Sequence, residues 1–231
     1  MLRRAEVIAA IAGPDGSGKS SLVNAAGREA RRLVLTGVVG SLGDNSSIGY
    51  GESKLEPLFP DVTRRIRQVY DLGKHQGNRP VLFAAMVLHS MFTGRVVEPK
   101  MQRAGVKLII RDREPILDPL VLFHTYTGTD ISPTALSLAV RVASNPSRTD
   151  LLFLLTIDSE TALRRSKSST SPDFHESLEC MEAAQVAYKN FLLTRAMKRQ
   201  VSEIVFIDTG TNNLVMCTGV IMQSLLAKLG Y

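Results

Sequence analysis

The sequence is poor in cysteine and has no long apolar run. Its two cysteines, Cys180 and Cys217, are too few for a disulfide framework, and their spacing is unlike that of metal ligands. A reducing compartment suits such a chain, so a cytoplasmic location is expected. No window approaches the roughly 20 apolar residues that a membrane-spanning helix needs. Neither a disulfide-stapled nor a membrane-embedded protein is therefore expected.

A nucleic-acid-binding pattern is also missing. The formal net charge is +6, but no basic stretch is interleaved with aromatic residues as in RNA- or DNA-binding motifs. A ligand with several phosphates explains the excess of Lys and Arg equally well. No internal repeat or low-complexity segment is present, and 231 residues suffice for one α/β domain with a large core. A single domain over residues 1–231, with no nucleic acid or membrane partner, is expected.

Short apolar runs alternate with segments of helical periodicity. Strands are predicted at residues 6–12, 33–39, 106–111, 151–157 and 203–207. The helical segments are residues 18–31, 61–72, 80–104, 117–126, 133–143, 159–166, 176–200 and 213–229. Continuous apolar strands separated by helices predict an α/β fold with a parallel sheet covered on both faces. The polar, Gly- and Ser-rich residues 40–60 form a connection longer than usual, interpreted as functional or mobile.

Residues 13–20, with the sequence GPDGSGKS, match the phosphate-loop pattern G-x-x-x-x-G-K-S/T at every fixed position. An apolar strand precedes them and a helical segment follows, as this motif requires. The glycines let successive N–H groups point at one phosphate, and the helix N-terminus adds partial positive charge. Lys19 is predicted to reach the β- and γ-phosphates, and the Ser20 hydroxyl to bind Mg²⁺. The donor phosphates are expected to lie among Gly13, Asp15, Gly16, Ser17, Gly18, Lys19, Ser20 and Ser21.

Phosphoryl transfer also needs a carboxylate at the end of a neighbouring strand, where it holds Mg²⁺ or its waters. Three predicted strands end near an aspartate: Asp112, Asp158 and Asp208. Periodicity alone does not choose among them. Asp112 is favoured because Arg113 follows it, which puts an acid and a phosphate-binding cation in one turn. Asp158 is also explained as the cap of the next helix, and Asp208 as the start of a turn.

Four segments of the chain resemble the thymidylate kinases, a family of P-loop nucleoside monophosphate kinases. The phosphate loop carries an acid, Asp15, as many thymidylate kinases do. Residues 108–122 resemble the family's Asp-Arg-Tyr strand end and the helix after it, and residues 152–167 resemble the strand that leads into its lid. Residues 182–189 through 204–210 resemble its closing helix and last strand. The resemblance implies a three-layer P-loop kinase fold, with five parallel strands and a short lid at about residues 164–176.

The resemblance also implies an activity and roles for residues. The activity is phosphoryl transfer from ATP, with Mg²⁺, to a nucleoside monophosphate, most like dTMP. Asp15 would contact the acceptor's sugar hydroxyl or position its phosphate partners. Arg113 would hold the acceptor's phosphate, and Asp112 would lie near the metal. Arg165, with Arg164, would close over the donor from the lid, since cations on both sides stabilise the charge of the transferring group. A possible homodimer is implied by the resemblance alone.

The middle of the chain departs from the family pattern. Where the family has a base-reading arginine, this sequence has Met86-Val87, and Glu114 replaces the aromatic residue of Asp-Arg-Tyr. Two alternatives to the monophosphate kinase therefore stay open. One is a kinase of a nucleoside or another small hydroxyl compound, with Asp15 or Glu52 as the base. The other is a non-catalytic nucleotide-binding switch.

Overall fold

A computed structural model gives the structure of this chain. It describes residues 7–35, 48–50, 60–75, 78–92, 95–96, 98–103, 106–128, 130–143, 148–167 and 177–231. None of the helices in these ranges is both long enough and apolar enough to cross a membrane.

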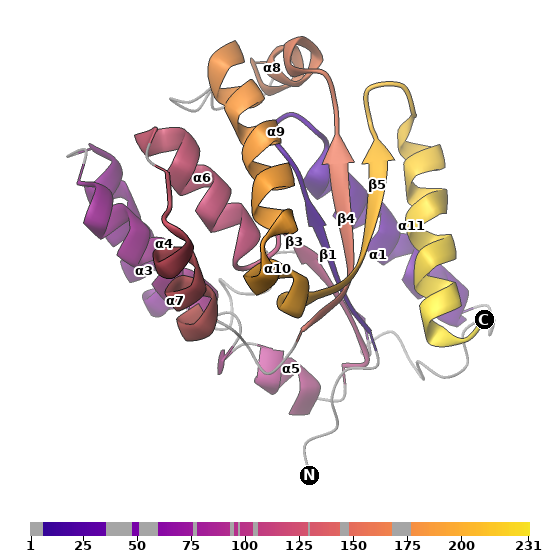
Figure 1. Cartoon of the computed structure of the whole chain (residues 1–231). Helices are drawn as coiled ribbons and strands as arrows, with labels where there is room; N and C mark the ends of the chain where they lie inside the picture. Colours follow the sequence, from indigo (N-terminus) through magenta and orange to yellow (C-terminus); the bar gives the residue numbers. More distant parts are fainter. Residues whose placement is uncertain are drawn as a thin grey trace.

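One parallel sheet forms the centre of the molecule, with the strand order β2-β3-β1-β4-β5. Figure 1 labels four of these strands, β3, β1, β4 and β5. The strands are β1 Val7–Ala12, β2 Ile48–Tyr50, β3 Leu108–Asp112, β4 Thr149–Thr156 and β5 Val201–Asp208. All neighbouring strands are parallel, so their carboxyl ends lie at one edge of the sheet. The predicted α/β class with a parallel sheet is confirmed.

Helices cover both faces of the sheet (Figure 1). They are α1 Lys19–Leu35, α3 Pro60–His75, α4 Arg79–Phe92, α5 Glu98–Arg103, α6 Leu117–Thr127, α7 Pro133–Ala143, α8 Ser159–Lys167, α9 Leu178–Leu193, α10 Arg195–Gln200 and α11 Leu214–Leu229. Successive side chains of β1 point to opposite faces, as in any strand. Ile11 packs in a cluster with residues of α1 and α11, whereas Ala10 packs with residues of α6, α7, α9 and α10. The middle strand is therefore enclosed on both sides.

The predicted strand at residues 33–39 is wrong where the structure describes it. Residues 33–35 are the last turn of α1, and residues 36–39 lie outside the described ranges. Leu33 and Val34 are partly buried against the cluster that the rest of α1 contacts, which explains the apolar run. The edge strand is instead β2, inside the polar stretch that was interpreted as a connection.

Two long predicted helices are each divided. The segment at residues 80–104 forms α4 and α5, and Pro99 lies in the first turn of α5, where a missing N–H costs no hydrogen bond. The segment at residues 176–200 forms α9 and α10. Thr194 between them has extended backbone angles, and its hydroxyl accepts a hydrogen bond from the Met197 N–H of α10. At residue 194, local capping chemistry thus divided a helix that the apolar spacing alone would have continued.

A buried ion pair lies on the side of the sheet that holds α5. Glu98 of α5 and Arg111 of β3 are 2% and 8% exposed, and their charged groups are 2.5 Å apart. Arg111 also donates to the Thr149 hydroxyl over 2.7 Å, and that hydroxyl donates to Glu114 over 3.3 Å. These buried side chains connect α5, β3, β4 and the residues before α6 through polar contacts.

Removing one partner of this pair should be costly. Glu98→Ala leaves the buried Arg111 guanidinium without this carboxylate, and the free energy of unfolding should fall by about 3–5 kcal/mol. The control is Glu203→Ala, which breaks the exposed pair with Lys228 (3.1 Å) and should cost less than about 1 kcal/mol. Urea denaturation measures both. Equal losses in the two variants would contradict a buried, desolvated pair.

Candidate active site

The phosphate loop connects the carboxyl end of β1 to the first turn of α1, so the predicted strand–loop–helix arrangement is confirmed. Gly13, Gly16 and Gly18 all have positive φ, at 152°, 77° and 88°. A Cβ at Gly16 would also collide with the backbone carbonyl of Ala162 in α8. The loop therefore packs directly on the helix that begins the predicted lid, and only glycine allows this approach.

Lys19 lies inside the loop and is 6% exposed. Its Nζ donates to the carbonyl oxygens of Gly13 (2.8 Å) and Pro14 (2.9 Å) and to Asp15 Oδ1 (3.2 Å). Burial lowers the pKa of the Lys19 ammonium, and the nearby Arg113 charge lowers it further. The ammonium is thus held at the loop by three oxygens, next to the N–H groups that would bind phosphate.

The Ser20 hydroxyl donates to Asp112 Oδ2 over 2.8 Å. This contact joins the last residue of the phosphate loop to the carboxyl end of β3, because β3 pairs with β1 and places Asp112 opposite Ile11. Of the three candidate aspartates, Asp112 is therefore the one beside the loop. Sequence periodicity had left this choice open.

The other two aspartates have local structural roles. Asp158 accepts a 2.7 Å hydrogen bond from the Thr161 N–H and caps α8. This bond lowers the pKa of its carboxyl group. Asp208 accepts from the Gly210 N–H and the Thr211 hydroxyl, both at 2.8 Å, in the turn after β5. Both alternative explanations offered for these residues are confirmed.

Ser20 and Asp112 fit a magnesium ion by their chemistry. Mg²⁺ prefers oxygen ligands and is held in such sites by one or two protein groups together with phosphates and waters. Asp112 Oδ1 is buried and has no hydrogen-bond partner among the described residues, so one carboxylate oxygen is left for a further ligand. Among all the residues that the structure describes, no group of three or more His, Cys, Asp or Glu side chains is placed to hold a metal ion. A metal held here would depend on nucleotide phosphates for its other ligands.

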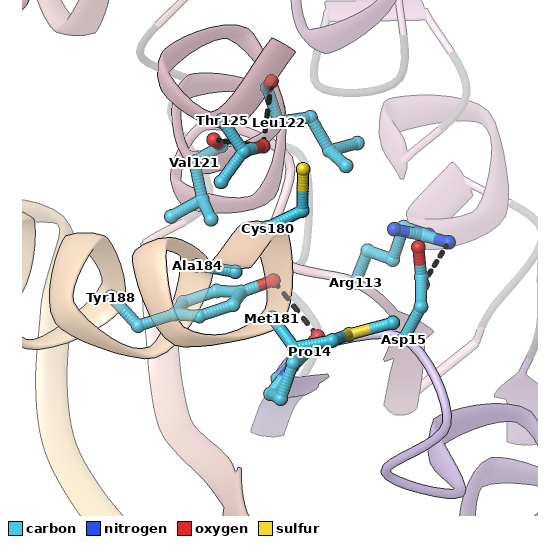
Figure 2. A pocket seen from close by; sticks show the side chains of 11 residues that line it. Pro14, Asp15, Arg113, Val121, Leu122, Thr125, Cys180, Met181, Ala184 and Tyr188 are labelled. Carbon is cyan, nitrogen blue, oxygen red and sulfur yellow. Dashed lines mark hydrogen bonds and ion pairs between the residues drawn. The ribbon is translucent and has the colours of Figure 1, made fainter. Parts of the chain in front are cut away.

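A small pocket of about 30 Å³, open to solvent, lies beside the loop (Figure 2). Its polar end is an ion pair between Asp15 and Arg113, with 3.4 Å between Oδ1 and the guanidinium. Arg113 has a φ of 89°, which is unusual for a residue other than glycine, and its N–H donates to the Ile11 carbonyl of β1. Backbone strain of this kind is often found at functional sites.

Two helices form the rest of the pocket wall. They contribute Val121, Leu122 and Thr125 from α6 and Cys180, Met181, Ala184 and Tyr188 from α9 (Figure 2). Most of these side chains are apolar. The Thr125 hydroxyl lies 3.0 and 2.9 Å from the carbonyl oxygens of its own helix at Val121 and Leu122, so its proton is already used. The pocket thus combines an apolar wall with one charged end at the phosphate loop.

The predicted lid cations lie on α8, away from this pocket. Arg165 donates to the Thr209 carbonyl after β5 over 3.0 Å, and Arg164 donates to the Thr161 hydroxyl over 3.1 Å. Both side chains are exposed. Residues 168–176 of the predicted lid lie outside the described ranges. Closure of these arginines over a donor nucleotide stays a prediction.

Sequence analysis assigned no role to three buried residues, Glu114, Asp118 and Tyr188. Asp118 is 0% exposed, and Tyr188 lies 2.7 Å from its Oδ1 and 2.9 Å from the Gly13 carbonyl oxygen. Glu114, which replaces the family's aromatic residue, accepts from the Ile116 and Leu117 N–H groups and caps α6. The capping role had a sequence signal, an acid three residues before a helical segment. The Asp118–Tyr188 contact spans 70 residues and had none.

Comparison with known proteins supports the fold. No protein-family model and no curated protein matches the chain. A deoxyadenosine kinase from M. mycoides with the products dCMP and a flexible dCDP bound matches with a TM-score of 0.58 and 16% identity, over 96% of this chain and 100% of that one. A second structure of a deoxyadenosine kinase from M. mycoides, with dCTP bound, matches with a TM-score of 0.57 and 15% identity, over 96% of this chain and 100% of that one. A third structure, with dATP bound, matches with a TM-score of 0.55 and 20% identity, over 95% of this chain and 99% of that one.

The chain shares its fold with these deoxyadenosine kinase structures. The match covers almost the whole length of both chains, and the identities of 15–20% establish architecture alone. The predicted α/β fold with helices on both faces of a parallel sheet is therefore confirmed, and the short lid stays a prediction. The specific resemblance to thymidylate kinases, the homodimer and the roles of the site residues stay predictions.

The contact between the loop and α8 is open to a direct test. If the loop binds ATP, Gly16→Ala should weaken that binding by roughly tenfold or more, because the new methyl group must displace either the loop or the Ala162 backbone. The matched control is Gly128→Ala, which also has positive φ (57°) but open space around it. Isothermal titration with ATP should show near-normal affinity for the control. Equal affinities in both variants would show that the loop does not need this packing.

Proposed function

We propose that this protein transfers the γ-phosphoryl group of ATP to a hydroxyl group of a nucleoside. The observation that carries the proposal is the Asp15–Arg113 pair, which joins the phosphate loop to the end of β3 and lines one end of an otherwise mostly apolar pocket. A donor at the loop and an acceptor in the pocket would meet at this pair. The structural likeness to deoxyadenosine kinases supports the same class of reaction.

The charge of the pocket favours an uncharged acceptor. Among the described residues that line it, Arg113 is the cation and Asp15 is the anion, so the two charges offset each other. A monophosphate would bring additional negative charge next to the Asp15 carboxylate, and that repulsion needs more cations than these residues supply. A nucleoside brings an apolar base and a hydroxyl group, which match the apolar wall and the acid.

In this mechanism the chain positions both substrates and moves one proton. Lys19 exchanges its loop oxygens for the β- and γ-phosphate oxygens of ATP. The Asp15 carboxylate accepts the proton of the nucleoside hydroxyl while that oxygen forms a bond to the γ-phosphorus, and the bond from phosphorus to the β–γ bridging oxygen breaks to release ADP. Arg113 stabilises the negative charge on the transferring group.

Magnesium and the lid would assist this transfer. Ser20 and Asp112 would hold Mg²⁺, which would supply positive charge to the phosphates of ATP. Arg165 and Arg164 would add positive charge from the donor side if α8 closes over ATP. Closing the site would also exclude water, which otherwise competes as the acceptor.

A second candidate is a nucleoside monophosphate acceptor, most like dTMP. The observation in its favour is that Arg113 lines the pocket beside Asp15, as the resemblance to thymidylate kinases implies for a phosphate-binding arginine. On this alternative, Asp15 would contact the acceptor's sugar instead of taking its proton.

Assaying ADP release over a panel of nucleosides and nucleoside monophosphates tests the proposal. Nucleosides should stimulate ADP release, and Lys19→Met should reduce it roughly 10²–10³-fold because a donor to the developing charge is lost. The control, Lys228→Met, changes an exposed lysine that pairs with Glu203 and should keep full activity. Stimulation by monophosphates alone would favour the second candidate. No stimulation by any acceptor would reject both kinase proposals.

Asp15→Asn separates the two roles of this residue. As the base for a nucleoside hydroxyl, Asp15 should affect kcat, which would fall roughly 10²–10⁴-fold with little change in the acceptor KM. The amide keeps the size and polarity of the side chain, so a contact with the sugar alone would be partly preserved. Steady-state kinetics over a range of acceptor concentrations distinguishes the roles. A rise in KM at constant kcat would contradict the role as base.

A further inference from the structure

A buried acid and a tyrosine connect the back of the phosphate loop to its lysine. The Tyr188 hydroxyl of α9 lies between Asp118 Oδ1 of α6 (2.7 Å) and the Gly13 carbonyl oxygen (2.9 Å). The same carbonyl oxygen accepts a 2.8 Å hydrogen bond from Lys19 Nζ. Asp118 is therefore two hydrogen bonds away from the carbonyl that holds Lys19, although it has no part in the phosphoryl transfer described above.

The number of protons decides which hydrogen bonds can form together. Tyr188 has one hydroxyl proton and two oxygens within reach. If Asp118 is ionised, its carboxylate is the stronger acceptor and takes that proton, which leaves two oxygens facing each other at the Gly13 carbonyl. If Asp118 carries a proton on Oδ1, it donates to Tyr188, and Tyr188 donates to Gly13. Oδ2 accepts from the Glu114 N–H at 2.7 Å in either state. The protonated acid satisfies every contact.

Charged groups from several elements surround Asp118. Burial raises the pKa of its carboxyl group to about 6, whereas the positive charges of Arg113 at the end of β3 and Lys19 of α1 act to lower it. The Glu114 carboxylate, between β3 and α6, is directed at the N–H groups of α6. Burial also raises the pKa of Tyr188 well above its usual value, so the phenol stays neutral. The Asp15 carboxylate is the remaining charge near Tyr188.

We propose that binding of a nucleoside triphosphate at the loop is coupled to proton uptake by Asp118. Once Asp118 is protonated, the Tyr188 hydroxyl donates its hydrogen bond to the Gly13 carbonyl oxygen instead of to Asp118. The inference rests on the proposed function, since it requires ATP to bind at the loop. An ionised Asp118 competes with the phosphates for the positive charge of Lys19 and Arg113. A neutral Asp118 leaves that charge to the phosphates and keeps Gly13 in place through Tyr188. Asp118 acts as a positioning residue, because it does not contact the substrate itself.

The direction of the pH effect follows from the raised pKa. In the free protein Asp118 is protonated below about pH 6 and ionised above it. ATP affinity should therefore decrease as the pH rises through this value. Linkage is reciprocal, so bound ATP must raise the pKa of Asp118 and draw a proton from solution. The same coupling thus predicts both the loss of ATP affinity at higher pH and the uptake of a proton when ATP binds.

Asp118→Asn provides a close mimic of the protonated acid. The amide oxygen can accept from the Glu114 N–H, and the amide NH₂ can donate to Tyr188, which then donates to Gly13. Isothermal titration with ATP and Mg²⁺ at about pH 6.5, in two buffers of different ionisation enthalpy, measures the protons taken up on binding. The wild type should take up several tenths of a proton more than the variant. Protonation of ATP itself is common to both proteins and cancels in the difference.

Two further measurements sharpen this test. Above about pH 7.5, Asp118→Asn should bind ATP several-fold more tightly than the wild type, and the two affinities should converge near about pH 5.5. The control is Asp150→Asn, which changes a half-buried acid that accepts from the Ile8 N–H at the start of β1. Its proton uptake should equal that of the wild type.

Each outcome of these titrations decides the inference. Equal proton uptake in the wild type and Asp118→Asn, with ATP bound to both, would overturn the coupling and leave the proposed kinase intact. Failure of ATP to bind either protein would overturn both proposals. If Asp118→Asn does not fold, infrared difference spectra of the wild type decide the question. ATP binding should then increase the band of a protonated carboxyl group, and its absence would reject the coupling.

Discussion

The pairing of β3 with β1 is the constraint on which the whole candidate site depends. It places Asp112 opposite Ile11, and this position lets the Asp112 carboxylate accept a hydrogen bond from Ser20 at the start of α1. It also places Arg113 one residue further, where its N–H bonds to the Ile11 carbonyl and its guanidinium meets Asp15. A shift of one residue in this parallel register would turn both side chains to other faces of the sheet.

The cations of the site are paired with oxygen atoms of the protein itself. Lys19 is buried and held by two carbonyl oxygens and one carboxylate, and Arg113 is paired with that same carboxylate. The loop thus stabilises its cations with oxygens that phosphates can replace. Asp118 adds a further acid close to both cations, whose charge depends on a proton. The positive and negative charges of the site therefore offset each other in the absence of a ligand. The site attracts phosphate more strongly when Asp118 is neutral, or when phosphate oxygens replace Asp15 as partners of the cations.

The prediction of the site was strongest where one short segment carries the chemistry. The phosphate loop, the Ser20 hydroxyl and the favoured Asp112 all follow from local sequence, and the structure brings these residues together. The pocket wall was not predictable, because α6 and α9 are far apart in the chain and their apolar residues look like core residues in either case. The strand predicted at residues 33–39 failed for a related reason, since a short apolar run can end a helix as well as form a strand.

The sequence by itself determined the strand–loop–helix geometry around residues 13–20. A glycine pattern with a lysine and a serine, between an apolar strand and a helix, forms through local contacts. The tertiary structure confirmed Asp112 as the aspartate that faces the serine, and it alone decided which helices form the pocket and how Asp118 reaches Gly13 through Tyr188. These contacts join residues that are 70 to 175 positions apart. Strand register and helix packing bring them together, and no local pattern in the chain encodes either one.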